Sequence, residues 1–256
     1  MIDIHSHIVF EVDDGAKTID QSIEMIKEAK DAGFEKIIVT PHYMENYYEK
    51  NRNEIESKVS EIKDKLMDIN CRIPIYIGNE IYITENIIKL LENQKASSIN
   101  DKQYVLFELP LNAEAMNLNR VVYLLLENGK IPILAHPERY PFVQKDVNSL
   151  IQLIESGVLM QSNYGSIIGQ YGKNAENTVK EMLKHNMVHM LGSDAHRDQT
   201  IYLQIEKCMK KIEKIVGEEE LENITNLNIQ KVLDGEKIEV KNPQYVKENF
   251  FSKIFK

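Results

Sequence analysis

The segment Asp3-Ile4-His5-Ser6-His7 places two histidines two residues apart, where an apolar run ends. In an extended segment this spacing directs both imidazoles to the same face. Two neighbouring imidazoles can bind a divalent metal ion, although histidines at strand ends also serve in packing. The pair is therefore an ambiguous sign of a metal site until further ligands are identified.

Further side chains of metal-ligand type follow the later apolar runs of the chain. His42 ends Thr-Pro-His, Glu80 ends Gly-Asn-Glu, and Glu108 lies in Phe-Glu-Leu-Pro. The complete set of candidate ligands is His5, His7, Asp14, His42, Glu80, Glu108, His136, Asp194 and His196. Asp14 is also compatible with an ordinary turn, because it lies in Asp-Asp-Gly. Imidazoles and carboxylates without sulfur favour Mn, Fe, Zn or Co, with Mg as a further possibility, and the set exceeds the needs of one ion.

The net charge of −9 bears on the substrate, because an acidic protein lacks the basic surface of a nucleic-acid-binding protein. Two or three divalent ions would outweigh or balance the candidate carboxylates and attract a phosphate group. Metal ions also lower the pKa of a bound water and stabilise the transition state of phosphoryl transfer. Arg139, three residues after His136, can offer a planar guanidinium to phosphate oxygens, the alternative being an ion pair with Glu138 or Asp146. We therefore predict metal-assisted hydrolysis of a phosphoester.

Short β-branched runs alternate with helical patterns along the chain, and these elements must position the ligands. The predicted strands are 1–5, 36–40, 75–78, 104–107, 131–135, 158–161 and 188–191, and the predicted helices are 18–32, 53–67, 84–91, 113–127, 147–155, 174–185 and 201–215. Strands alternating with helices indicate parallel strands joined by crossover helices. No strand is followed by Gly-x-Gly-x-x-Gly, so a closed barrel is favoured over an open nucleotide-binding sheet. We predict one α/β domain over residues 1–256, a distorted (β/α)7 TIM-like barrel.

Such a barrel explains the spacing of the candidate ligands, because functional side chains gather at the C-terminal ends of parallel barrel strands. Every predicted strand except the sixth is followed by a candidate ligand. The sixth is followed by Asn163, which can donate a hydrogen bond to a ligand or cap the strand. Tyr43, next to His42, can stack on a substrate ring or pack in the core. The joint placement predicts a metal cluster at one mouth of the barrel.

Cys71 and Cys208 lie far apart and outside any Cys-x-x-Cys pattern, so we expect reduced thiols in a cytoplasmic protein. Neither has the arginine that cysteine-dependent tyrosine phosphatases carry six positions later, since Ile77 and Lys214 occupy those positions. No apolar run approaches the length of a membrane span, and no secretion signal is recognisable. A terminal apolar group, for which we predict docking on the barrel, comprises Phe250, Phe251, Ile254 and Phe255.

The motifs together define a resemblance to a known family. They are His5-Ser6-His7, Thr40-Pro41-His42, Phe107-Glu108-Leu109-Pro110, His136-Pro137-Glu138-Arg139 and Gly192-Ser193-Asp194-Ala195-His196. This set resembles the PHP (polymerase and histidinol phosphatase) superfamily over about residues 1–200. The pair Asp13-Asp14-Gly15 and His-Pro-Glu-Arg is more closely similar to the CpsB/CapC branch, the manganese-dependent protein-tyrosine phosphatases of capsule and exopolysaccharide loci.

The resemblance implies a PHP fold with a trinuclear site, manganese being the expected metal. By resemblance, one ion takes His5, His7, Glu80 and Asp194, a second takes Glu80, Glu108 and His136, and a third takes Asp14, His42 and His196. Arg139 would bind phosphate, and Arg197 is the nearest candidate for a second functional arginine. The implied substrate is the phosphorylated tyrosine-rich tail of a bacterial tyrosine kinase that regulates polysaccharide synthesis. A PHP phosphatase acting on a small molecule such as histidinol phosphate, and a non-catalytic metal-stabilised binding module, are the alternatives.

Overall fold

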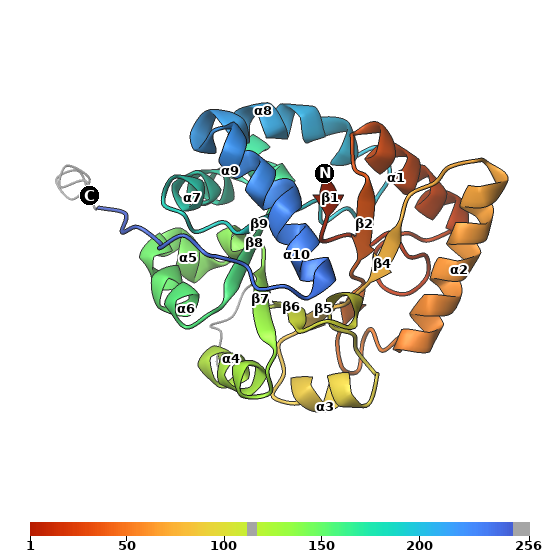
Figure 1. The fold of residues 1–256 in the computed structure, drawn as a ribbon, viewed down its shortest axis with the longest axis horizontal. Coiled ribbons are helices and arrows are strands. Elements are labelled where there is room, and N and C mark those ends of the chain that lie inside the picture. The colour runs from red at the N-terminus through yellow and green to blue at the C-terminus, as the bar shows by residue number, and fades with distance from the viewer. Residues whose placement is uncertain (112–116, 248–256) are drawn as a thin grey trace.

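The structure, a computed structural model, describes residues 1–111 and 117–247. Parallel strands and helices alternate along most of this part of the chain (Figure 1). The strands are β1 (Ile2–Asp3), β2 (Lys36–Val39), β3 (His42–Tyr43), β4 (Ile75–Ile77), β5 (Glu80–Tyr82), β6 (Tyr104–Glu108), β7 (Ile131–Ala135), β8 (Leu159–Asn163) and β9 (Met190–Gly192). The α-helices are α1 (Ile19–Asp31), α2 (Arg52–Asp68), α3 (Ile87–Glu92), α4 (Leu118–Glu127), α5 (Pro141–Lys145), α6 (Ile151–Glu155), α7 (Lys173–Lys184), α8 (Ile205–Val216), α9 (Glu218–Glu222) and α10 (Asn228–Asp234).

The strands form two parallel sheets, ordered β1-β2-β4 and β3-β5-β6-β7-β8-β9. Strands β2 and β3 are separated only by Thr40-Pro41, where proline removes a backbone donor, and β4 and β5 only by Gly78-Asn79. Each of these pairs makes one row of the sheet, so the rows number seven in the described residues. A parallel bridge between Ser6 and Ala195 joins the first row to the last. The predicted distorted (β/α)7 barrel is confirmed.

The predicted elements differ from the observed ones mainly at their ends. The first strand is confined to β1, and the helix predicted from residue 84 begins at Ile87. Helix α4 begins at Leu118, while residues 113–116 of the predicted helix lie outside the described residues. The predicted docking of the terminal apolar group at 250–255 also concerns residues outside the described part. Helices α5, α9 and α10 were not predicted, because segments of five to seven residues carry too little periodicity.

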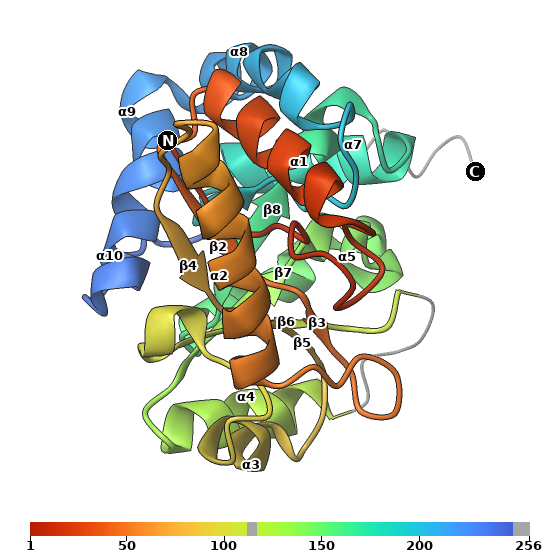
Figure 2. The same cartoon turned by 90° about the vertical axis from the view of Figure 1, so that its right-hand side faces the viewer.

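Helices α1 and α2 lie side by side on the outside of the barrel (Figure 2). The Thr18 hydroxyl accepts a hydrogen bond from the backbone N–H of Gln21 at 3.2 Å and so caps α1. Asn51 and Glu54 form a reciprocal capping box at the start of α2. These caps satisfy backbone donors that the first helical turn leaves free. The caps therefore fix the N-termini of α1 and α2, where the loops that follow β1 and β3 end.

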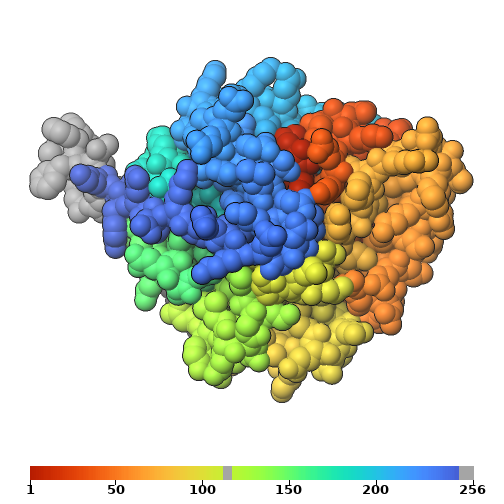
Figure 3. Space-filling model, viewed as in Figure 1, coloured from red at the N-terminus to blue at the C-terminus, as the bar shows by residue number. Residues whose placement is uncertain are grey.

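The hydrophobic core has a part inside the barrel and a part between the barrel and its helices. Inside, Ile4 and Ile133 pack with Ile229 and Val232 of α10, so that α10 closes one end of the barrel. Figure 1 shows α10 crossing the end that faces the viewer. Figure 3 shows the segment after α10 running over the same face, where the Gln244 N–H donates to the His185 carbonyl at 2.9 Å. Polar side chains at the strand ends must therefore converge at the opposite mouth.

Cys71 and Cys208 are both free, and Cys208 is fully buried. Within residues 1–111 and 117–247, the helices are too short or too polar to cross a membrane.

Candidate metal centre

The nine predicted ligands come together at the C-terminal mouth of the barrel, although they are spread over almost 200 residues. His5 and His7 follow β1 and bring their Nε2 atoms to 3.1 Å from each other. Parallel pairing of β3 with β5 places His42 beside Glu80. His42 and Glu80 begin these short strands and lie just beyond the C-terminal ends of β2 and β4, where barrel strands place functional side chains.

Glu80 lies at the centre of the cluster and is completely buried. Its Oε2 is 3.2 Å from His5 Nε2, 3.3 Å from His7 Nε2 and 3.0 Å from His42 Nδ1. Within the described residues, neither Glu80 Oε2 nor His42 Nδ1 makes a hydrogen bond. Buried polar atoms without partners are costly. Separations of this size arise when ligand atoms share an ion at about 2.1 Å, so the residues fit a metal centre.

Three overlapping groups of ligand atoms are close enough to hold separate ions. The groups are His7, Asp14, His42 and His196; His5, His7 and Glu80; and His42, Glu80 and Glu108. Asp194 Oδ1 lies 3.5–3.6 Å from ring nitrogens of His5, His7 and His196. His136 Nε2 lies 2.8 Å from Glu80 Oε1. The groups share members, so ions bound to them would be neighbours.

The grouping differs in detail from the one that the family resemblance implies. His7 belongs to the group of Asp14 and His196 as well as to the group of His5. His42 belongs to the group of Glu80 and Glu108 as well. Both imidazoles therefore lie at the boundary between neighbouring groups.

Charge complementarity within the cluster favours the protonated form of two of its imidazoles, those of His5 and His42. Burial alone would lower the pKa of His5, but the charges of Glu80 and Asp194 outweigh it and raise this pKa to about 9. For His42, burial is likewise outweighed by Glu80 and Glu108, which raise the pKa to about 12. A hydrogen bond with His196 lowers the pKa of Asp14. The protein without metal therefore carries paired ions at neutral pH.

Metal binding at pH 7 is expected to release about two protons, because His5 and His42 must become neutral before their nitrogens coordinate an ion. Affinity for metal should accordingly rise from pH 7 to pH 9, because protonation of His5 competes with metal binding less and less as the pH approaches its pKa. Calorimetric titration in buffers of different ionisation enthalpy measures the release directly. Binding enthalpies that do not depend on the buffer would contradict this expectation.

Backbone conformations at the mouth are unusual for residues other than glycine. His136 has φ 36° and ψ 52°, and Asp194 has φ 53°, both in the left-handed region. Such conformations persist only when the surrounding structure enforces them. Gly192 allows close packing, because a Cβ there would lie 2.6 Å from the Cβ of His5. The backbone is thus adapted to bring these ligands together.

Buried polar residues behind the ligands were not predicted from the sequence. Asp13 Oδ2 accepts a hydrogen bond from His7 Nδ1 at 2.7 Å and another from the His42 backbone N–H at 2.9 Å. Gln161 Oε1 accepts from His5 Nδ1 at 2.7 Å. Donation through Nδ1 leaves the Nε2 lone pair of each imidazole for a metal ion. Asp13 was overlooked because Asp-Asp-Gly also describes a turn, and Gln161 because it lay within a predicted strand.

Asp13→Asn is expected to weaken metal binding about 10- to 100-fold. Both oxygens of Asp13 accept hydrogen bonds, Oδ1 from the Gly15 N–H and Oδ2 from His7 and His42. An asparagine NH₂ group would therefore face another donor and turn the His7 ring. Metal titration followed by calorimetry measures the effect, with the exposed Asp64→Asn as the matched control. Equal affinities of the two variants would contradict the orienting role.

Three further residues singled out in the sequence, Arg139, Asn163 and Arg197, lie close to Asp194 or line the cavity that reaches it. Arg139 Nη1 donates to Asp194 Oδ2 at 3.0 Å, and not to Glu138 or Asp146. Asn163 Nδ2 donates to the same oxygen at 2.7 Å. Arg197 instead donates through Nη1 to backbone carbonyls, among them that of His196 at 2.6 Å. Both arginines line a cavity of about 220 Å³ that reaches Asp194 and His196.

The prediction that Tyr43 contacts a substrate is corrected by the structure. Its side chain is 2% exposed and packs in the hydrophobic core, because it points away from the mouth beside β5. Tyr48 takes the neighbouring position instead, with its ring stacked on His42 at 5.8 Å between centroids. Successive side chains of a strand point to opposite faces, so His42 faces the mouth whereas Tyr43, the next residue of β3, faces the core.

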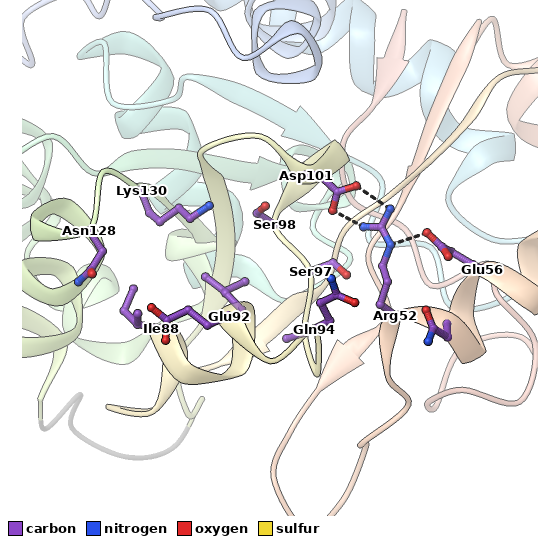
Figure 4. A pocket seen from close by; sticks show the side chains of 13 residues that line it. Arg52, Glu56, Ile88, Glu92, Gln94, Ser97, Ser98, Asp101, Asn128 and Lys130 are labelled. Atoms are coloured by element: carbon purple, nitrogen blue, oxygen red, sulfur yellow. Dashed lines mark hydrogen bonds and ion pairs between the residues drawn. The ribbon is translucent and has the colours of Figure 1, made fainter.

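A second cavity, of about 530 Å³, lies away from the ligands between α2, α3 and the segment before β6 (Figure 4). Arg52 donates to both carboxylate oxygens of Asp101, at 2.6 and 2.8 Å, and to Glu56 at 2.6 Å. Lys130 lies on the other side of this cavity. The Arg52 guanidinium is already paired with the carboxylates of Asp101 and Glu56, so these charged groups satisfy one another. We therefore do not assign a functional site to this cavity.

Comparison with known sequences gives matches over most of the chain. Residues 1–234 match the family described as "Capsular polysaccharide synthesis, CpsB/CapC". A protein named putative tyrosine-protein phosphatase CapC from Staphylococcus aureus is 35% identical over 196 residues, 77% of each chain. The tyrosine-protein phosphatase YwqE of Bacillus subtilis (strain 168) is 30% identical over 247 residues, which cover 96% of this chain and 97% of YwqE.

Comparison with solved structures gives a consistent result. A crystal structure from a study of YwqE from Bacillus subtilis and CpsB from Streptococcus pneumoniae, described as unique metal-dependent tyrosine phosphatases, matches with a TM-score of 0.91 at 30% identity. The match covers 97% of this chain and 100% of the other. Histidinol phosphate phosphatase from Lactococcus lactis matches with a TM-score of 0.53 at 15% identity, which indicates a shared fold only.

Proposed function

Because this chain belongs to the CpsB/CapC family of capsular polysaccharide synthesis, we propose that it is a metal-dependent tyrosine phosphatase that acts at the barrel mouth. The single observation that carries the proposal is Oε2 of the buried Glu80, which three imidazoles approach to within 3.0–3.3 Å and which, within the described residues, accepts no hydrogen bond. The cavity beside this cluster is lined by Arg139 and Arg197. A cluster of ions next to an arginine-lined cavity suits the hydrolysis of a phosphate monoester.

We propose a centre of three ions, with manganese as the native metal and Fe, Zn, Co or Mg as possible substitutes. Three overlapping ligand groups support this number. The proposed ligands are His5, His7, Asp14, His42, Glu80, Glu108, His136, Asp194 and His196. When bound, such ions activate a water molecule and neutralise charge on the phosphate.

The protein's own side chains would bind and orient the substrate. Arg139 keeps its guanidinium beside the cavity through a hydrogen bond to Asp194. Its remaining donors suit two phosphate oxygens at once. Asp13 and Gln161 hold the rings of His7 and His5. A tyrosine leaving group has a pKa of about 10, so its departure requires no strong general acid.

We further propose that the substrate is the phosphorylated tyrosine-rich tail of a bacterial tyrosine kinase that controls polysaccharide synthesis, and that the reaction takes place in the cytoplasm. Relatives named as tyrosine-protein phosphatases, in a family of capsular polysaccharide synthesis, support this proposal. The side chains of Asp14 and His42 are partly exposed at the barrel mouth, so a phosphotyrosine on a protein tail could reach the proposed metal centre. We also propose that residues 1–256 form a single catalytic domain.

The proposed function is tested by stripping the protein of metal and reloading it with each candidate ion. Manganese-loaded protein is expected to hydrolyse a phosphotyrosine peptide, and a chelator should stop the reaction. A phosphoserine peptide of the same sequence is the matched control and should react much more slowly. Turnover of histidinol phosphate with no turnover of the peptide would indicate a small-molecule phosphatase. Full metal content without activity on any phosphoester would indicate a binding module.

A further inference from the structure

Tyr171 lies at the mouth of the barrel but is not among the proposed metal ligands. It belongs to the turn between β8 and α7, between Gly169 with φ 83° and Gly172 with φ 92°. Glycine adopts these left-handed conformations at little steric cost. Two such residues around a short turn allow it to bring Tyr171 back over the cavity that Arg139 lines.

Tyr171 contacts Arg139 through the face of its ring. The guanidinium carbon lies 4.5 Å from the ring centroid, which is within the range of a cation–π interaction. The Arg139 side chain is partly buried, and its positive charge is balanced by Asp194. A cation shielded from water gains more from an aromatic face than an exposed one does.

The phenol of Tyr171 adds a second contact to the same group. Its OH donates to Asp194 Oδ2 at 3.4 Å, the oxygen that also accepts from Arg139 at 3.0 Å and from Asn163 at 2.7 Å. Asp194 Oδ1, in contrast, faces the ring nitrogens of His5 and His7. The two oxygens of Asp194 thus have separate partners.

Arg139 needs such a restraint because its side chain is long and rotatable. Within the described residues it donates one side-chain hydrogen bond, through Nη1 to Asp194. One bond leaves the plane of the guanidinium free to turn about it. Tyr171 covers one face of that plane and leaves the donors at its edge available to the cavity.

We propose that Tyr171 is a positioning residue that fixes the guanidinium plane of Arg139 for binding a phosphate group. The proposal rests on the proposed function, in which Arg139 binds the phosphate of the substrate. Tyr171 acts through Arg139 and takes no part in the chemical step.

The test compares Tyr171→Leu, Tyr171→Phe and the wild type, all loaded with manganese. Affinity for inorganic phosphate is measured by calorimetry, KM and kcat with a phosphotyrosine peptide, and metal content by elemental analysis. Tyr171→Leu is expected to bind phosphate about 10-fold more weakly and to raise KM more than it lowers kcat, with metal content unchanged. Tyr171→Phe keeps the ring and should stay within about 3-fold of the wild type. The exposed Tyr123→Leu, whose ring faces Arg120 at 5.6 Å, is the matched control.

A double-mutant cycle separates positioning of Arg139 from a general structural effect. In the Arg139→Ala background, Tyr171→Leu is expected to cause no further loss of phosphate affinity. Additive losses, depleted metal in Tyr171→Leu, or wild-type phosphate affinity in that variant would each overturn the proposal. If the wild-type protein binds phosphate but leaves phosphotyrosine peptides intact, the proposed function fails. The phosphate affinities would still decide the role of Tyr171.

Discussion

Glu80→Gln is expected to lose the metal centre and to lower phosphatase activity by about 10³-fold or more. Glu80 contacts His5, His7 and His42 through one oxygen and His136 through the other, so it belongs to every part of the cluster except the outer group at Asp14. An amide keeps the size of the side chain but removes the negative charge and one of the two acceptor oxygens. Elemental analysis after dialysis should show fewer bound ions than in the wild type.

A thermal measurement distinguishes loss of metal from loss of fold in this variant. Manganese is expected to raise the Tm of the wild type, because an ion bound only to the folded state stabilises it. The Tm of Glu80→Gln should respond much less to the same concentration. Glu85→Gln, on the exposed segment after β5, is the matched control and should behave as the wild type. Full metal content in Glu80→Gln would refute the central position assigned to this carboxylate.

Arg139→Ala is expected to lower kcat/KM by about 10²- to 10³-fold while the protein keeps its metal ions. Within residues 1–111 and 117–247, the hydrogen bond of Arg139 to the cluster goes to Asp194 Oδ2, an oxygen that also accepts from Asn163 and should keep that bond when the guanidinium is removed. We therefore expect this variant to lose a donor to the substrate and to keep all the proposed ligands of the ions. Steady-state kinetics with a phosphotyrosine peptide, together with elemental analysis, separates the two effects.

Arg139→Lys sharpens the same experiment. Lysine keeps the charge but lacks the planar fork that binds two phosphate oxygens, so most of the loss should remain. The exposed Arg72→Ala is the matched control for removal of a positive charge, and it should leave activity unchanged. Depleted metal in Arg139→Ala would instead assign Arg139 to the support of Asp194.

The fold and the convergence of the candidate ligands were largely predictable from the sequence, for a physical reason. Buried parallel strands are apolar throughout, and the first polar residue after each of them marks its C-terminal end. In a barrel all of these ends meet at one mouth, so the sequence predicts that His5, His42, Glu80 and Asp194 lie together. The structure brings them within 3.6 Å of a neighbouring ligand.

The short elements were less predictable. Strands β3 and β5 are two or three residues long and continue β2 and β4 after a break, so they have no periodicity of their own. Helix α10 closes the barrel from the end of the described chain, through contacts with β1 that no local pattern encodes. These features depend on pairing between residues far apart in the sequence.

The sequence alone was enough to predict which side chains are candidate metal ligands and which strands they follow, because residue type and strand periodicity are local properties. Only the tertiary structure decided how those side chains are supported. Asp13 orients His7, Gln161 orients His5, and Tyr171 packs on Arg139, each through a contact that depends on side-chain direction. Such contacts follow from how the chain closes on itself, since Gln161 and His5 are 156 residues apart. His5 and His7 can thus be recognised from the local sequence, whereas the orientation of their rings depends on Gln161 and Asp13.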